Sequence, residues 1–320
     1  LRQIPFDLNS NVFHFDTEII IQLILGNFRI KELPIPTYYG DEICHVDGLV
    51  YAKDVFKATV LVPFQKAGLL YQRKYDVSPE NRPYESKTQF DSTHSRAISA
   101  VPPGSTVLDI GCSTGAVARA LRARGCTVTG LDELPVEQVD GPNDYHQFKL
   151  GAEFLPVDPS NYEFVLLLDV IEHLKYPEKF INLLYDSLAS SPETEIIATT
   201  GNVAFGPVRL MLLLGMFNYG KRGILDLDHS RLFTFSSFQN LFTDRGFKVF
   251  EITGVPAPFH LALQATWLAS ILTFINSVGI RIWRRFFAFQ VFMRLKPVPS
   301  LDWLLAQAHE QAELEMLNNS

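Results

Sequence analysis

Apolar and polar residues follow two distinct rhythms from about residue 101 onward. Uninterrupted apolar runs are typical of strands buried on both faces, whereas apolar positions three or four residues apart indicate helices that pack on one side. Alternation of the two patterns predicts an α/β fold built on a parallel sheet. We expect its strands at residues 106–110, 127–131, 145–150, 164–168, 195–200, 247–252 and 289–295.

Helical patterns lie between these strands, at residues 115–124, 177–190 and 236–245. Pro177 stands in the first turn of the second helix, where a missing N–H costs no hydrogen bond. A chain of 320 residues is long enough for two domains, or for one large domain with appendages.

Two apolar stretches interrupt the strand and helix pattern, and we expect them to form helical cap inserts at residues 203–220 and 255–285. Residues 252–280 contain no charged side chain and are long enough to span a bilayer. Polar residues lie along this stretch, however, and Pro256 and Pro258 flank its apolar part near the start. A cap over the core, or a helix resting on a membrane interface, therefore fits better than a transmembrane span.

Composition divides the rest of the chain. Residues 71–100 are polar and contain prolines, which indicates a linker. We also expect a leader helix before the first strand, to which Lys87 and Phe90 belong. An ordinary amphipathic linker helix is the alternative for those two residues. The predicted parts are a small N-terminal α+β fragment, a linker with its leader helix, a main domain and a C-terminal helical tail, at residues 1–70, 71–100, 101–298 and 299–320.

Charge and cysteine content exclude some classes of function. The formal net charge of −7 argues against nucleic acid as a partner, because phosphate binding needs a basic surface. The three cysteines lack the paired spacing of a zinc site or a disulfide framework, so we expect a reducing, cytoplasmic setting. The chain starts at Leu1 without a signal segment, and the content of its first 70 residues favours a piece of a longer protein over a processed start.

A glycine turn follows the first strand of the main domain, within the segment VLDIGCSTG at residues 107–115. Gly111 permits a sharp turn off the strand, and Gly115 allows the next helix to pack closely. A dinucleotide loop, with the pattern G-x-G-x-x-G, would have glycine at its third position, where Ser113 stands. Asp109 within the strand and Asp132 at the end of the next strand instead suit a cofactor with ribose hydroxyls and positive charge.

Three segments together resemble the class I S-adenosylmethionine-dependent methyltransferases: VLDIGCSTG at 107–115, GLD at 130–132 and LDVIEHL at 168–174. The DVIEH element is similar to the subgroup of ubiquinone-biosynthesis O-methyltransferases, as is HSRLFT at 229–234. This resemblance covers roughly 200 residues in the right order. It implies a Rossmann-like seven-stranded sheet with helices on both faces, and S-adenosyl-L-methionine as the cofactor.

The resemblance also implies which residues hold the cofactor. Asp132 would bind the ribose hydroxyls, and Asp169 and Val170 would line the methyl-transfer pocket. Lys149 departs from the family, which often has an acidic residue there to accept the adenine amino group. The implied cofactor-binding set is Asp109, Gly111, Cys112, Ser113, Gly115, Asp132, Asp169 and Val170.

Methyl transfer to a hydroxyl needs a group that accepts the hydroxyl proton. His173 and His229 are candidates for that base, and Glu172 is a candidate to orient a histidine or the substrate. A structural role is the alternative for each histidine, and we expect no metal. The expected acceptor is a small or lipid-linked molecule. Peripheral contact of the apolar inserts with the inner face of a membrane is compatible with such an acceptor. The oligomeric state and the choice among O-, N- and C-methylation stay open.

The first 70 residues predict a helix at 13–22 and a strand at 28–36. The segments FDTE at 15–18, LPIP at 33–36 and TYYGDE at 37–42 resemble the carboxyl-terminal part of family 2 glycosyltransferases of the polyprenyl-phosphate type. That resemblance would place Asp16 and Glu18 near the acceptor side of such an enzyme. The alternatives are a helix–strand appendage, a bifunctional sugar transferase, and a cofactor-fold scaffold without catalysis.

Overall fold

The computed structural model describes residues 3–36, 46–66, 70–77, 90–151, 154–262 and 266–318. The chain divides into two compact units, each discontinuous in sequence. The larger unit comprises Tyr84–Arg209, Asp228–Pro258 and Ile271–Ser320. The smaller comprises Leu1–Pro83, Leu210–Leu227 and Phe259–Ser270.

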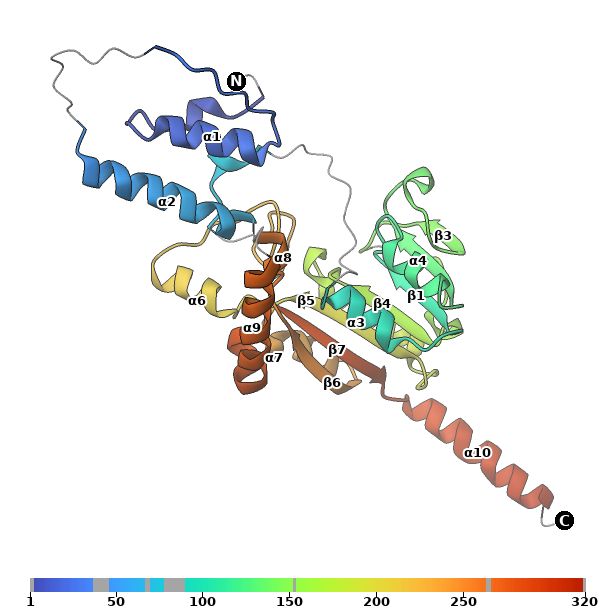
Figure 1. Cartoon of the computed structure of the whole chain (residues 1–320). Helices are drawn as coiled ribbons and strands as arrows, with labels where there is room; N and C mark the ends of the chain where they lie inside the picture. The colour runs from blue at the N-terminus through green and yellow to red at the C-terminus, as the bar shows by residue number, and fades with distance from the viewer. Residues whose placement is uncertain are drawn as a thin grey trace. The chain divides into compact units, whose positions relative to one another are not determined.

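A seven-stranded sheet in the order β3-β2-β1-β4-β5-β7-β6 forms the centre of the larger unit (Figure 1). Its strands are β1 Thr106–Ile110, β2 Thr127–Asp132, β3 Asp144–Gln147, β4 Phe164–Leu168, β5 Glu195–Gly201, β6 Phe247–Val255 and β7 Gln290–Pro297. All seven strands were predicted from the sequence. Strands β1 to β5 pair in parallel as expected, but β7 pairs antiparallel with both β5 and β6, which apolar runs alone do not reveal.

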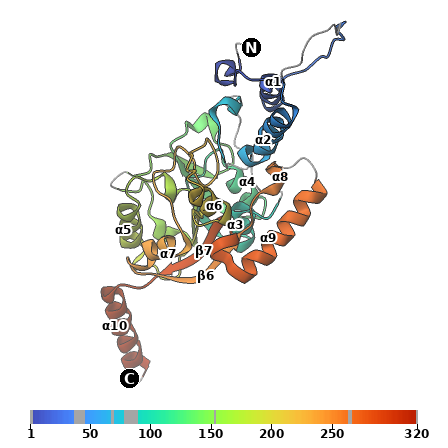
Figure 2. The same cartoon turned by 90° about the vertical axis from the view of Figure 1, so that its left-hand side faces the viewer.

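Helices cover both faces of this sheet, and the central strands supply apolar side chains to each side. On β1, Leu108 and Ile110 belong to the same core cluster as side chains of α5 (Pro177–Leu188) and α7 (Phe235–Thr243). Val107 belongs instead to the cluster that includes α3 (Thr93–Ala100) and α4 (Ala116–Arg122). The two helical layers separate on either side of the strands in Figure 2. Burial on both faces explains why β1 and β4 lack a polar–apolar alternation.

The leader helix and the tail are present where the sequence predicted helices. Helix α3 begins with a capping box, in which the Ser92 and Ser95 side chains each accept from the other's backbone N–H. Phe90 precedes this helix and does not lie within it, and Lys87 falls outside the described residues. At the other end of the chain, α10 covers Leu301–Asn318.

The predicted inserts are also helical. Helix α6 covers Gly206–Leu213, α8 covers Phe259–Ala262 and α9 covers Thr266–Phe287. Helix α9 is kinked at Trp283, whose backbone angles are not helical. Within the described residues, no helix combines the length and the apolar character that crossing a bilayer requires.

The smaller unit contains α1 (Phe15–Leu25), which was predicted, and α2 (Gly48–Lys66), which was not. The strand predicted at residues 28–36 is wrong, because these residues form no strand in the structure. Two prolines in the segment LPIP lack the N–H that a strand ladder uses. The segment TYYGDE at 37–42 lies outside the described residues.

Glu18 is the buried charge of the smaller unit, with only 1% of its surface exposed. Its carboxylate forms ion pairs with Lys74 and His14 and accepts from the backbone N–H of Ser10. Hydrogen bonds and these charges lower the pKa of Glu18 although burial opposes them. The side chain therefore ties α1 to the segment around Lys74, whereas Asp16 is exposed.

Candidate active site

The turn between β1 and α4 is fastened to the end of β2. The backbone N–H groups of Gly111 and Cys112 donate to the carbonyl oxygen of Leu131, at 2.7 and 3.2 Å. Ser113 adopts a left-handed backbone conformation with φ of 50°, which is uncommon for residues other than glycine. Its N–H donates to Oδ2 of Asp132 at 2.7 Å. The residue that replaces a dinucleotide-loop glycine thus keeps a glycine-like backbone and orients a carboxylate.

Asp132 stands at the carboxyl end of β2 and is partly exposed. Besides Ser113, the N–H of Leu134 donates to its other carboxylate oxygen, Oδ1, at 3.1 Å. Tyr145 on β3 adds support, because its hydroxyl, with one proton to donate, lies 2.9 Å from the backbone oxygen of Asp132 and 2.5 Å from that of Leu134. Tyr145 was missed by sequence reasoning, since an aromatic residue on a short strand carries no signal of a backbone contact.

Asp109 lies on β1 with only 2% of its surface exposed. Within the described residues, its Oδ2 atom has no hydrogen-bond partner. Burial, with a further contribution from the charge of Asp132, raises the pKa of Asp109 to about 7. A buried acceptor without a donor beside a second carboxylate is suited to a ligand that brings N–H donors and positive charge.

Two other predicted residues of the loop have packing roles. The Sγ atom of Cys112 lies against Gly130, where an added Cβ would come within 2.8 Å of it. Burial raises the pKa of this thiol, so Cys112 stays neutral at pH 7. An added Cβ on Gly115 would lie 2.4 Å from the carbonyl oxygen of Asp140. Lys149 is exposed beyond the end of β3.

Asp169 follows β4 and is the centre of a hydrogen-bond network drawn from three other elements. Its Oδ1 accepts from the Thr199 hydroxyl on β5, at 2.8 Å. Its Oδ2 accepts from the Gln290 amide on β7 at 2.8 Å and from the Thr93 hydroxyl of α3 at 3.5 Å. The leader helix therefore contributes to the site through Thr93. Sequence reasoning missed all three partners, because they are remote from Asp169 in the chain.

The turns after β1 and β4 also touch each other. An added Cβ on Gly111 would lie 2.4 Å from Cγ2 of Val170. Val170 itself is buried. The predicted cofactor residues of these two neighbouring strands are therefore brought together at the carboxyl ends, where open α/β sheets bind ligands.

Glu172 lies in the short helix η5 (Ile171–His173) with 3% of its surface exposed. The N–H of Gly201 donates to its Oε1 at a long distance of 3.4 Å, and its Oε2 has no partner in the described part of the chain. Burial, and then the negative charge of Asp169, raise the pKa of Glu172 to about 8. The side chain is therefore protonated at neutral pH.

The two candidate histidines lie next to each other in the structure. The sequence named each as a candidate base but did not indicate that they are in contact. The rings of His173 and His229 meet edge to face, with centroids 4.8 Å apart. Nδ1 of His173 lies 3.2 Å from the carbonyl oxygen of Asp228. Because a carbonyl only accepts, Nδ1 carries the proton, and Nε2 of the neutral ring is the basic nitrogen.

The segment that carries His229 is held against η5. The N–H of Arg231 donates to the backbone oxygen of Glu172 at 3.0 Å. The Arg231 guanidinium forms an ion pair with Glu178 at the start of α5, at 2.8 Å. Among the described residues, no group of three or more histidine, cysteine or acidic side chains is placed to hold a metal ion.

A mostly parallel α/β sheet with a buried carboxylate on β1 and an oriented one at the end of β2 is typical of a Rossmann-like domain with a nucleoside-type cofactor site. A family model described as a methyltransferase domain matches residues 80–252, which is more than half of the chain. The chain belongs to this methyltransferase family. The unpartnered Asp109 oxygen and the fixed Asp132 carboxylate fit S-adenosylmethionine, which carries an amino group, a sulfonium and ribose hydroxyls.

Curated relatives include ubiquinone biosynthesis O-methyltransferases. The protein from Pseudomonas entomophila (strain L48) is 33% identical over 90 residues, which cover 26% of this chain and 39% of the relative. The protein from Pseudomonas putida (strain W619) is 31% identical over the same length and the same shares. The matched chain thus spans about two fifths of the length of these relatives.

Solved structures with a similar arrangement include two described as S-adenosylmethionine-dependent methyltransferases. The one from Archaeoglobus fulgidus has a TM-score of 0.42 at 15% identity and covers 63% of this chain and 90% of its own. The one from Aquifex aeolicus has a TM-score of 0.42 at 12% identity and covers 68% and 95%.

Proposed function

We propose that the protein methylates a hydroxyl group of a small or lipid-linked acceptor, with His173 as the base. The observation that carries this proposal is the contact of His173 Nδ1 with the Asp228 carbonyl, which leaves Nε2 as the proton acceptor. The names of the curated relatives, which are O-methyltransferases, also support a hydroxyl acceptor.

S-adenosylmethionine, when bound, supplies an activated methyl group on its sulfonium. In our proposal Asp132, held by the N–H groups of Ser113 and Leu134, accepts hydrogen bonds from the ribose hydroxyls. Asp109 supplies negative charge toward the amino group and the sulfonium. The remaining task of the protein is to hold the acceptor oxygen in line with the methyl carbon.

The other predicted catalytic residues assist in this scheme. The edge-to-face contact of His229 restrains the ring of His173. Glu172 is protonated at neutral pH because its pKa is raised to about 8, so its carboxyl group donates a hydrogen bond to the acceptor. Neither residue carries the transferred proton.

The test identifies the methylated product by mass spectrometry with isotope-labelled cofactor, and then compares variants. We expect His173→Ala to lower kcat by about 10²–10⁴-fold while the Kd for the cofactor stays unchanged. His309→Ala, on the exposed face of α10, is the matched control and keeps full turnover. A product methylated on nitrogen or carbon, or equal turnover of both variants, would refute the proposal.

Calorimetry distinguishes a catalytic protein from a scaffold that keeps the cofactor fold without catalysis. We expect the wild-type chain to bind S-adenosylmethionine and its demethylated product, and Asp132→Ala to abolish that binding. A chain that fails to bind either compound would contradict a catalytic role.

We further infer that residues 1–70 are the carboxyl-terminal fragment of a polyprenyl-phosphate-type glycosyltransferase. Helix α1 and the segments FDTE and LPIP support this inference. Of the two acids that the resemblance places near the acceptor, Glu18 is engaged by Lys74 and His14, and Asp16 is exposed. The gene sequence upstream of Leu1 tests it: nucleotide-binding strands followed by an Asp-x-Asp motif are expected, and a different preceding domain would refute it.

A further inference from the structure

Helix α9 exposes an apolar face from Ile271 onward. Five apolar residues recur at three- and four-residue steps along one face, and they are exposed by 39% to 79%. A surface helix of a globular protein normally turns such a face inward. The exposed residues are Ile271, Phe274, Ile275, Val278 and Ile282.

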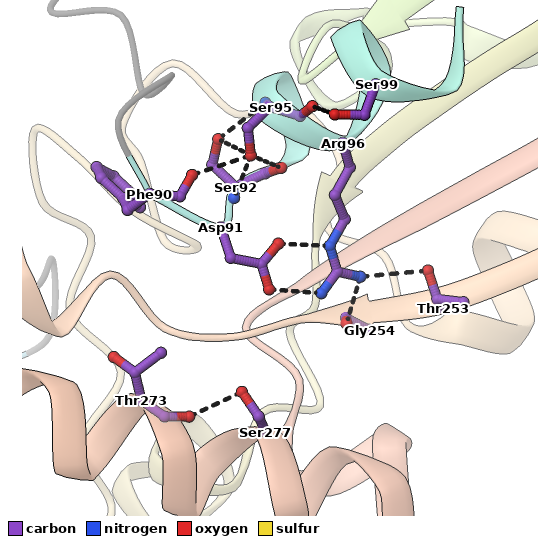
Figure 3. Close-up of polar contacts among 10 residues, drawn as sticks. All are labelled: Phe90, Asp91, Ser92, Ser95, Arg96, Ser99, Thr253, Gly254, Thr273 and Ser277. Carbon is purple, nitrogen blue, oxygen red and sulfur yellow. Dashed lines mark hydrogen bonds and ion pairs between the residues drawn. The ribbon is translucent and has the colours of Figure 1, made fainter.

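The side of α9 that faces the protein combines Ile280, which packs against the core of the larger unit, with several polar side chains. The amide of Asn276 is buried, accepts from the N–H of Ala257 at 3.0 Å and donates to the carbonyl oxygen of Phe287 at 2.8 Å. Figure 3 shows Thr273 and Ser277 on the side of α9 turned toward β6, joined by a 2.8 Å hydrogen bond. Gly279 also lies on this inner side, where an added Cβ would come within 2.7 Å of the ring of Phe287. The orientation of the helix is thus fixed by specific contacts, and its apolar face is the outer one.

The charged residues of α9 itself are all positive, in a chain whose net charge is −7. Residues 252–301 contain no Asp or Glu, and Arg281, Arg284 and Arg285 follow the apolar face. Arg284 donates to the backbone oxygen of Ile252, but Arg281 and Arg285 are exposed and form no ion pair among the described residues. An exposed apolar face with cations at its end matches the surface of an anionic bilayer.

A groove lies beside the inner side of the helix. It has a volume of about 480 Å³ and is lined by Arg281, Arg284 and Ser277 of α9, by β6, and by the Asp91–Arg96 pair. Figure 3 shows that pair, with both guanidinium contacts to Asp91 at 2.7 Å and a further contact to the backbone of Gly254 at 3.0 Å. These bonds join the start of α3 to β6. The part of the groove formed by Asp91 and Arg96 is therefore held in place by hydrogen bonds.

We propose that the α9 face, defined as Ile271, Phe274, Ile275, Val278 and Ile282, docks on an anionic phospholipid surface. The apolar side chains enter the boundary of the acyl chains, and Arg281 and Arg285 contact phosphate groups. The helix lies in the plane of the interface and does not span the bilayer. This inference goes beyond the proposed methyl transfer and does not require it.

The test is flotation of the full chain with unilamellar vesicles, without cofactor or acceptor. We expect binding to phosphatidylcholine vesicles that contain about 30% phosphatidylglycerol, much weaker binding to phosphatidylcholine alone, and a loss of binding at high salt. Because catalysis plays no part in the assay, its outcome is independent of the proposed function.

Two pairs of variants locate the surface. Phe274→Ser should lower the vesicle partition coefficient about tenfold, since a large apolar side chain no longer leaves water. Phe154→Ser is the matched control, because Phe154 is exposed by 69% against 71% for Phe274. Arg281→Gln with Arg285→Gln should lower partitioning about 25-fold, at about fivefold per arginine. Lys175→Gln with Lys179→Gln, at the start of α5, is the charge control.

Three results would overturn the proposal. One is equal binding to neutral and anionic vesicles, and another is equal loss from Phe274→Ser and Phe154→Ser. The third is a dimer in light scattering that Phe274→Ser dissociates, without vesicle binding, which would make the α9 face a contact between copies of the chain.

Discussion

The buried carboxyl group of Glu172 makes the stability of the larger unit depend on pH. Burial and the nearby charge of Asp169 raise its pKa to about 8 from the ordinary value of 4.5. Between these two values the unfolded chain has released the proton and the folded chain has kept it. The folded state therefore binds more protons, and the free energy of unfolding falls as the pH rises, by about 1.4 kcal/mol per pH unit at most.

Glu172→Gln removes this dependence, because an amide of nearly the same shape does not titrate. From pH 6 to pH 8 the wild-type chain should lose about 2–3 kcal/mol through this group, and the variant should not. At about 2–4 °C per kcal/mol, the melting temperature of the variant relative to wild type should rise by several degrees over that interval.

Thermal unfolding of the full chain, followed by circular dichroism at constant ionic strength, measures the difference. The transition of the larger unit is identified as the one that shifts upward when S-adenosylmethionine is added. Glu137→Gln, at an exposed position, is the control and should follow the wild-type pH dependence. Parallel pH profiles for wild type and Glu172→Gln would refute the reasoning.

Two further predictions concern the cofactor loop. A cationic ligand lowers the raised pKa of Asp109, which is about 7, so the affinity for S-adenosylmethionine should increase from pH 6 to pH 8, and Asp109→Asn should flatten that profile in calorimetry. A flat wild-type profile would show that Asp109 does not face the cofactor charge. Gly115→Ala should cost about 1–3 kcal/mol more than Gly104→Ala in denaturant unfolding, because both glycines have φ near +82° but only Gly115 has a backbone oxygen 2.4 Å from the added Cβ. Equal costs would mean that the loop at Asp140 moves away freely.

The sheet could be predicted from the sequence because its signals are local. The runs at β1 and β4 were predicted with their observed bounds, since continuous apolar strands between glycine, proline and polar residues leave little choice of boundary. The direction of β7 could not be predicted, because apolar runs do not distinguish parallel from antiparallel pairing. Helix α9 follows β6 in the chain and leads into β7, which enters the sheet between β5 and β6.

The sequence indicates candidate residues for the site but not their contacts. Their positions on two strands indicated Asp109 and Asp132, and the resemblance to methyltransferases indicated the DVIEH element. The donors to Asp169 come from α3, β5 and β7, and Thr93, Thr199 and Gln290 are 76, 30 and 121 residues from it in sequence. Only the folded topology brings those donors to the end of β4.

In the described part of the larger unit, the non-glycine residues with a left-handed backbone lie where two neighbouring strands end. Ser113 and Asp169 follow the neighbouring strands β1 and β4, and their φ values are 50° and 55°. Each left-handed residue of this kind costs about 1–2 kcal/mol. In both cases the strained N–H is used: that of Ser113 donates to Asp132 at 2.7 Å, and that of Asp169 donates to the Thr199 hydroxyl at 2.9 Å. The strain is thus retained by hydrogen bonds that also fix both carboxylates, so the site needs little rearrangement when its ligands bind.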